Sequence, residues 1–110
     1  MTTEVLSKVL EIDITHCSLC KGDADLFFVD KDGGHYINIY ELAHKCKSYV
    51  VRNSGWTLQS YTNERGAGIC RVKVGDGQEI NKFIDASEVE SIFKASEWVI
   101  QELKNKGKIK

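Results

Sequence analysis

An apolar stripe near the C-terminus constrains the fold of this chain more than any other feature. Apolar residues recur every three or four positions there, which is the period of one face of an α-helix: Val89, Ile92, Phe93, Val99, Ile100 and Leu103. Ser87 followed three residues later by Glu90 forms a capping box, and Gly107 suits a left-handed cap. The pattern predicts a helix over 87–106 that needs an apolar surface to cover.

The residues just before this helix supply such a surface. Cys70, Val72 and Val74 alternate with Arg71 and Lys73, as in a strand with one buried and one exposed face. The alternation predicts that the two cationic side chains point away from the helix.

Two further strands complete the predicted C-terminal sheet. Trp56 and Leu58 mark the inward face of a preceding strand, which is joined to the next by a flexible loop over 63–68. The Gly-Asp-Gly sequence at 75–77 predicts a tight turn, because glycine tolerates positive φ. In the third strand, 79–84, the apolar residues do not alternate, which indicates a bulge.

The N-terminal half shows a looser version of the same pattern. Apolar residues alternate over 8–14 and predict a half-buried strand, after a segment 1–7 that is frayed or leads into an edge strand. Residues 26–29 and 36–37 predict two short strands, joined by an Asp- and Gly-rich turn at 30–34.

A second helix is predicted to begin at Asn38, a good N-cap with Glu41 three residues on, and to end at 53–55. Its apolar positions have the spacing of the later helix: Ile39, Leu42, Ala43, Cys46, Tyr49 and Val50. A duplicated unit and two ordinary amphipathic helices both explain this match, and poor side-chain identity between the halves favours the second explanation.

These patterns predict one α+β domain over 1–110, with halves at 8–53 and 56–107. In it, two antiparallel meanders carry two amphipathic helices, so that a strand-strand-helix unit occurs loosely twice. A length of 110 residues and a hydrophobic content of 42% fit one domain with a modest core. A net charge of −1 argues against a polyanion binder driven by bulk charge.

Localisation is inferred from what the chain contains. No N-terminal apolar run suits a signal peptide, and no stretch is long enough to span a membrane. Four cysteines without a secretory signal favour reduced thiols. We therefore expect a cytoplasmic protein.

Cys17 and Cys20 form the only metal-like feature of the sequence. Two cysteines two residues apart, followed by glycine, can form half of a structural zinc site. The site would need two further ligands, for which Cys46, His16 and His35 are candidates. The alternative is a plain turn with reduced thiols.

Trp98 is a candidate interface residue. It lies about half a turn round the predicted helix from the apolar stripe, near Lys94 and Glu102. Because exposed aromatic residues anchor protein interfaces, these three residues and Tyr61 are predicted to contact a partner protein. The alternative is that Trp98 packs inside the fold.

The outer face of the predicted C-terminal sheet is a candidate nucleic-acid surface. It carries polar and basic side chains that can reach base edges in a groove: Gln59, Tyr61, Arg71 and Lys73, with Arg65 in the adjoining loop. The alternative is an ordinary solvated sheet face.

No nucleophile, phosphate-loop or calcium-loop pattern is complete in the sequence, so no cofactor except zinc is expected and a non-catalytic protein is favoured. We expect a protein-binding module of inhibitor, immunity or adaptor type that occludes a larger partner. Phages and mobile elements often encode such small chains to block a larger machine. A DNA-binding module and a zinc-stapled interaction domain are the alternatives, and a homodimer would give Trp98 another use.

Overall fold

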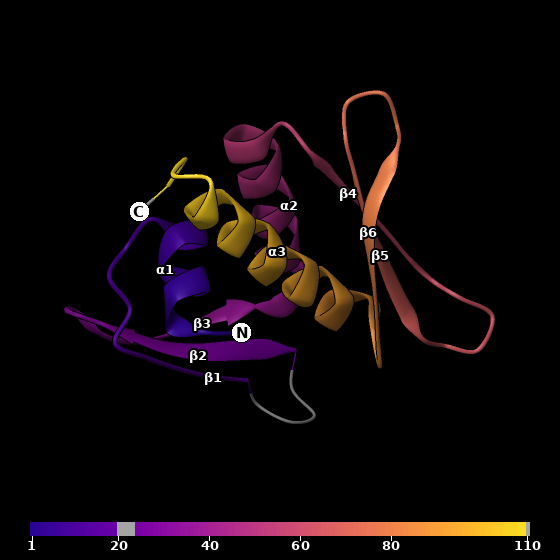
Figure 1. Cartoon of the computed structure of the whole chain (residues 1–110). Helices are drawn as coiled ribbons and strands as arrows, with labels where there is room; N and C mark the ends of the chain where they lie inside the picture. The colour runs from indigo at the N-terminus through magenta and orange to yellow at the C-terminus, as the bar shows by residue number, and fades with distance from the viewer. Residues whose placement is uncertain (20–23, 110) are drawn as a thin grey trace.

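The computed structural model describes residues 1–19 and 24–109. Within these residues the chain forms three helices and two three-stranded antiparallel sheets (Figure 1). Sheet A has the strand order β1 (His16–Leu19), β2 (Asp25–Asp30), β3 (Gly33–Asn38), and sheet B has the order β4 (Thr57–Thr62), β5 (Gly68–Lys73), β6 (Glu79–Asp85). The helices are α1 (Thr3–Leu10), α2 (Ile39–Ser54) and α3 (Glu88–Asn105).

The helices lie together between the two sheets, with sheet A below them and sheet B on the right in Figure 1. Each meander runs directly into a helix: sheet A into α2, and sheet B into α3. α3 packs along one face of sheet B and also against α2. The predicted α+β class, with antiparallel meanders that each lead into an amphipathic helix, is confirmed.

The N-terminal segment is a helix, so the prediction of a strand over 8–14 after a frayed segment 1–7 is wrong. The hydroxyl of Thr2 accepts a hydrogen bond from the amide of Val5 at 3.2 Å and caps α1. Val5, Leu6 and Val9 then fall on one buried helical face. Three helices therefore pack together where two were predicted.

Two periods overlap in this segment, which explains the error. Leu10, Ile12 and Ile14 alternate in the sequence, but Leu10 belongs to the last turn of α1 and the other two follow the helix. Glu11 ends the helix in the left-handed conformation, with φ 59°. Ile14 is buried and Ile12 is exposed, so these residues do not share a strand face.

The caps of α2 and α3 confirm the two predicted helices. The side-chain oxygen of Asn38 accepts hydrogen bonds from the amides of Tyr40 and Glu41, and Gly55 ends α2 at φ 73°. The Ser87 hydroxyl accepts a hydrogen bond from the Glu90 amide at 3.2 Å and donates one to the Glu90 carboxylate at 3.0 Å. These local contacts lie within three residues of each cap, which is why the sequence predicted them.

The bulge predicted in the third strand of sheet B is present. Val72 pairs with Asn81 and Lys73 with Glu79, so Ile80 is an additional residue in β6. A bulge on an edge strand disrupts the ladder locally and increases its twist.

The start of α3 is held tightly against sheet B. A Cβ atom added at Gly68 in β5 would lie 2.0 Å from the carbonyl carbon and oxygen of Ser87. The Ser60 hydroxyl also donates a hydrogen bond of 2.7 Å to the Glu88 carboxylate. Sheet B and α3 therefore meet backbone to backbone, which only glycine permits at this position.

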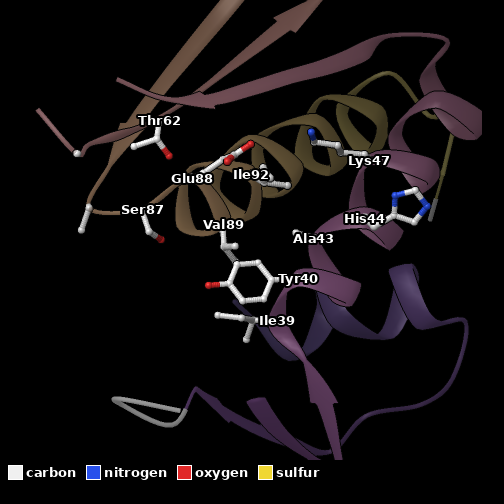
Figure 2. Close-up of a pocket in the computed structure, with 12 residues that line it drawn as sticks. Ile39, Tyr40, Ala43, His44, Lys47, Thr62, Ser87, Glu88, Val89 and Ile92 are labelled. Carbon is white, nitrogen blue, oxygen red and sulfur yellow. The ribbon is translucent and has the colours of Figure 1, made fainter. Parts of the chain in front are cut away.

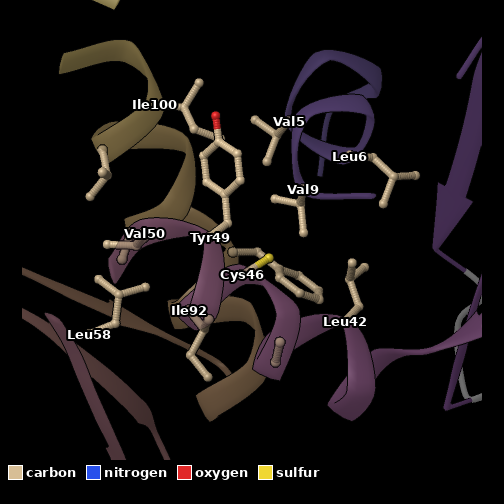
Figure 3. Close-up of a cluster of buried hydrophobic side chains, with 14 of the residues drawn as sticks. Val5, Leu6, Val9, Leu42, Cys46, Tyr49, Val50, Leu58, Ile92 and Ile100 are labelled. Atoms are coloured by element: carbon tan, nitrogen blue, oxygen red, sulfur yellow. The ribbon is translucent and has the colours of Figure 1, made fainter. Parts of the chain in front are cut away.

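One hydrophobic cluster runs through both predicted halves of the chain (Figure 3). Leu6 of α1, Leu26 of sheet A, Leu42 of α2, Val72 of sheet B and Val99 of α3 all belong to it, each with no exposed surface. Burial of these side chains is the main favourable term for the fold. None of the described helices has the length and apolar character needed to cross a membrane.

Candidate functional site

Sheet B has one covered and one uncovered face. Leu58, Cys70 and Val72 are buried on the face that meets α3. In Figure 1 no other described segment lies beyond the opposite face. We call this opposite side the outer face of sheet B; alternation and strand register assign to it Thr57, Gln59, Tyr61, Ile69, Arg71, Lys73, Glu79, Lys82 and Ile84.

Strand register arranges the outer face in rows. Tyr61, Ile69 and Ile84 are paired across the three strands and form an apolar row. Ile84 is 57% exposed and Tyr61 37%, whereas Ile69 between them is 8% exposed. Ile84, most of whose surface is exposed to water, is therefore part of a continuous apolar strip across the sheet.

The next row is polar, and one of its residues is held by its neighbours. Arg71 lies between Gln59 and Lys82 in the register. Its guanidinium group lies over the Tyr61 ring at 5.6 Å and donates a hydrogen bond of 3.2 Å to the Tyr61 hydroxyl. Its Nε atom is 3.2 Å from a carboxylate oxygen of Glu79, forming an ion pair. Arg71 thus connects all three strands on the outer face.

The other cations of this region have no such restraint. Within residues 1–19 and 24–109, no ion pair involves Lys73, Lys82 or Arg65 of the β4–β5 loop. Lys82 and Arg65 are exposed, and Lys73 is half-buried. The outer face therefore presents positive charge beside an apolar strip.

The structure brings together the residues predicted for nucleic-acid binding. Gln59, Tyr61, Arg71 and Lys73 share the outer face, and Arg65 lies in the adjoining loop.

Sequence reasoning missed Lys82 and Ile84, which the register adds to the same face. The bulge at Ile80 hid them, because it breaks the alternation of β6. Reading the alternation afresh after Ile80 would have placed both residues on the outer face.

Trp98 is part of an aromatic cluster on the opposite side of sheet B. Its ring stacks on that of Trp56, with ring centres 5.9 Å apart, and is tilted against that of Phe83, with ring centres 6.1 Å apart. Phe83 pairs with Cys70 in the register and so faces α3. The ammonium group of Lys106 lies 4.9 Å from the Trp56 ring centre. Trp98 is partly buried, and whether its remaining surface contacts a partner stays a prediction.

Lys94 and Glu102 share a helix face with Trp98, since they lie four residues before and after it. Lys94 donates a hydrogen bond to Asp85 at 2.9 Å, which lowers the pKa of Asp85 and raises that of Lys94. Tyr61 lies on the outer face, away from α3. The structure therefore does not bring Tyr61 together with the other three residues predicted for a protein interface.

The predicted metal pair is described only at one position. Cys17 lies in β1 with its thiol 3.7 Å from the carbonyl oxygen of Met1, and burial raises its pKa. Cys20 lies outside the described residues. In the described ranges, no three His, Cys, Asp or Glu side chains are close enough to hold a metal ion. Zinc binding therefore stays a prediction.

The two other described cysteines are buried. Cys46 in α2 and Cys70 in β5 have no exposed surface. Burial raises the pKa of Cys46 to about 12 and that of Cys70 to about 11. We therefore expect both thiols to react slowly in the native protein, because the thiolate is the reactive form.

A groove of about 470 Å³ lies between α2 and the start of α3 (Figure 2). Its floor is apolar, formed by Ala43, Val89 and Ile92 among others. Lys47 and His44 lie toward one end in Figure 2, and Ser87 and Glu88 toward the other. The Glu88 carboxylate already accepts the hydrogen bond from Ser60, so part of the polar lining serves to attach α3 to sheet B.

Comparison with family models, curated proteins and solved structures finds no match for this chain. Function is therefore inferred from geometry alone.

Proposed function

We propose that this protein is a small, non-catalytic protein-binding module whose contact surface is the outer face of sheet B. The observation that carries the proposal is the apolar row of Tyr61, Ile69 and Ile84, exposed at Tyr61 and Ile84, beside the restrained side chain of Arg71. An inhibitor, immunity or adaptor protein of this kind acts by occluding a larger partner. Such a protein needs only a binding face.

The chemistry of this face supports a protein partner. Tyrosine and arginine are enriched among the residues that contribute most to protein interfaces. Contacts with Tyr61 and Glu79 already restrain Arg71, so less side-chain entropy is lost when a partner binds. Ile84, 57% exposed, offers apolar surface that a partner can bury.

Close contacts with α3 support the outer face from beneath. Gly68 brings the backbone of β5 against the start of α3, and the hydrogen bond from Ser60 to Glu88 fastens β4 to the same helix. A surface that keeps its shape on binding loses little free energy to reorganisation.

Affinity capture with purified protein tests the proposal. Wild type, Ile84→Ser and Tyr61→Ala are immobilised at equal density, exposed to a lysate of cells that carry the gene, and the bound proteins are identified by mass spectrometry. Tyr36→Ser is the matched control, because Tyr36 is 70% exposed on sheet A. We expect a protein that wild type and Tyr36→Ser retain and both sheet B variants lose. Equal capture by Ile84→Ser contradicts the proposal.

DNA binding is the second candidate, and the basic side chains of the outer face support it. Arg71 and Lys73 lie two residues apart on β5, with Arg65 in the neighbouring loop. This function predicts affinity for a DNA duplex that falls steeply with salt and is lost in the double variant Arg71→Glu, Lys73→Glu. Ile84→Ser should leave such binding almost unchanged. A gel-shift assay at low salt with no retarded duplex excludes it.

A further inference from the structure

The outer face of sheet B and its adjoining loop differ in charge from the whole chain. The chain has a net charge of −1. Against this, the region combines the cations Arg65, Arg71, Lys73 and Lys82 with the anions Glu64 and Glu79. The local excess is positive, and the row that contains Arg71 and Lys82 lies next to the apolar row.

We infer that the outer face of sheet B binds an acidic protein segment in which carboxylates flank an apolar side chain. This inference rests on the proposed function and names the chemistry of the partner. Lys73 and Lys82 have no ion pair within the described residues, so both ammonium groups are available. A carboxylate of the bound segment can form an ion pair with either lysine without breaking an ion pair within this protein.

The spacing on β6 defines the segment further. Lys82 and Ile84 are two residues apart on one face of the strand, which places them about 7 Å from each other along its axis. An extended segment repeats its own side chains at the same interval on one face. A carboxylate two residues from an apolar side chain in the partner therefore matches Lys82 and Ile84.

Two features favour an acidic protein over a nucleic acid. Arg71, whose planar group is well suited to phosphate, is already paired with Glu79 at 3.2 Å. In the described part of the chain, the cations left without an ion pair on this face are therefore the lysines Lys73 and Lys82. In the adjacent row, Ile69 and Ile84 offer apolar surface without hydrogen-bond donors. Charge and apolar surface together complement a protein segment.

A peptide titration of the full-length protein tests the inference. The probe is a synthetic peptide with the repeat Glu-Thr-Leu-Thr, so that each glutamate is two residues from a leucine. Its control is the same peptide with lysine in place of glutamate. Two-dimensional ¹H–¹⁵N spectra of the labelled protein follow the titration. The acidic peptide should shift the amide signals of Ile69, Lys82 and Ile84. Its affinity should fall as salt rises, whereas the lysine peptide should not bind.

A matched pair of charge reversals locates the contact. Lys82→Glu should weaken binding of the acidic peptide by about tenfold or more, because one attraction becomes a repulsion. Lys45→Glu is the control, since Lys45 is an exposed lysine on α2 without an ion pair in the described residues. It should bind the peptide like wild type.

The possible outcomes separate this inference from the proposed function. If Ile84→Ser loses the captured protein but Lys82→Glu retains it and the acidic peptide does not bind, the acidic partner is wrong and protein binding stands. If a DNA duplex shifts the same signals and the peptide does not, the inference is overturned in favour of DNA. If capture does not depend on Ile84 and the peptide shifts no signals, both proposals fail.

Discussion

Sheets A and B share a topology and differ in what they present. Both are three-stranded antiparallel meanders that lead into a capped helix. On sheet A, alternation places Phe27 and Tyr36 together on one face, and their ring centres are 5.2 Å apart. On the outer face of sheet B, Tyr61 instead contacts the cation of Arg71, whose other contact is Glu79.

The sheets also differ in how their helices attach. α3 lies directly on sheet B through the close approach at Gly68. Sheet A leads into α2, but its buried Leu26 joins the cluster that includes Leu6 of α1, a helix outside the repeated pattern. The same order of elements therefore produces two different surfaces, because cross-strand neighbours and the covering helix, rather than topology, set the chemistry of each face.

Alanine substitution at matched glycines should show the largest difference between the sheets. Gly68→Ala should destabilise the protein by at least about 3 kcal/mol, because its methyl group would overlap the backbone at Ser87. Gly34→Ala on sheet A should cost about 1 kcal/mol, since its methyl group would meet only the Phe27 ring at 2.8 Å, and a side chain can move. Urea denaturation measures both.

Gly75→Ala is the control for the glycine pair, because a methyl group there would meet no atom within 4 Å. It should change the free energy of unfolding by less than about 0.5 kcal/mol. An equal loss of unfolding free energy in Gly68→Ala and Gly34→Ala would contradict the closer packing inferred between α3 and sheet B.

Removing the indole at position 98 should have the next largest effect. Trp98→Ala should destabilise the protein by about 2 kcal/mol, because the partly buried ring loses its contacts with Trp56 and Phe83. Trp98→Phe should lose less than half as much. Thermal unfolding checks both variants. Unchanged stability of Trp98→Ala would show that the ring adds little to the fold and would favour the predicted partner contact.

Thiol reactivity should distinguish the inner faces of the two sheets. Cys70 of sheet B is fully buried with a pKa of about 11, whereas Cys17 of sheet A is only partly buried. In the native protein at pH 8, iodoacetamide should alkylate Cys70 at least about tenfold more slowly than Cys17. Peptide mapping by mass spectrometry gives both rates. Similar rates would mean that the face of sheet B next to α3 opens readily.

The smallest effect should come from the ion pair that joins β6 to α3. The hydrogen bond from Lys94, followed by that from the Ala86 amide, lowers the pKa of Asp85. A carboxyl with a lowered folded-state pKa contributes stability above its unfolded pKa and loses that contribution as pH falls through the folded pKa. Asp85→Asn should therefore lower Tm slightly at pH 7, and the difference should shrink below the ordinary pKa of 3.8. A difference that persists at pH 2 would assign the loss to the amide itself.

The candidate surface could be predicted only in part. Alternation around Arg71 and Lys73 was sufficient to assign them to the outer face, because side-chain direction in a regular strand depends on position alone. Lys82 and Ile84 were missed, because the bulge shifts the register of β6 and both residues fall on the outer face only when the alternation is restarted after Ile80. For Trp98, helical spacing predicted its angle on α3, whereas its contact with Trp56 depends on packing between distant segments.

The sequence by itself determined α2, α3, the meander of sheet B, the two later strands of sheet A and the caps at Asn38 and Ser87, since these depend on periodicity and on hydrogen bonds within three residues. It did not determine β1 (His16–Leu19), because the first strand was predicted at 8–14. It did not determine α1, where two short periods compete and burial of Leu6 in the core decides for the helix. Only the tertiary structure decided which side chains meet on the outer face of sheet B. The physical reason is that cross-strand register and helix packing join residues far apart in the chain, and local periodicity carries no information about those contacts.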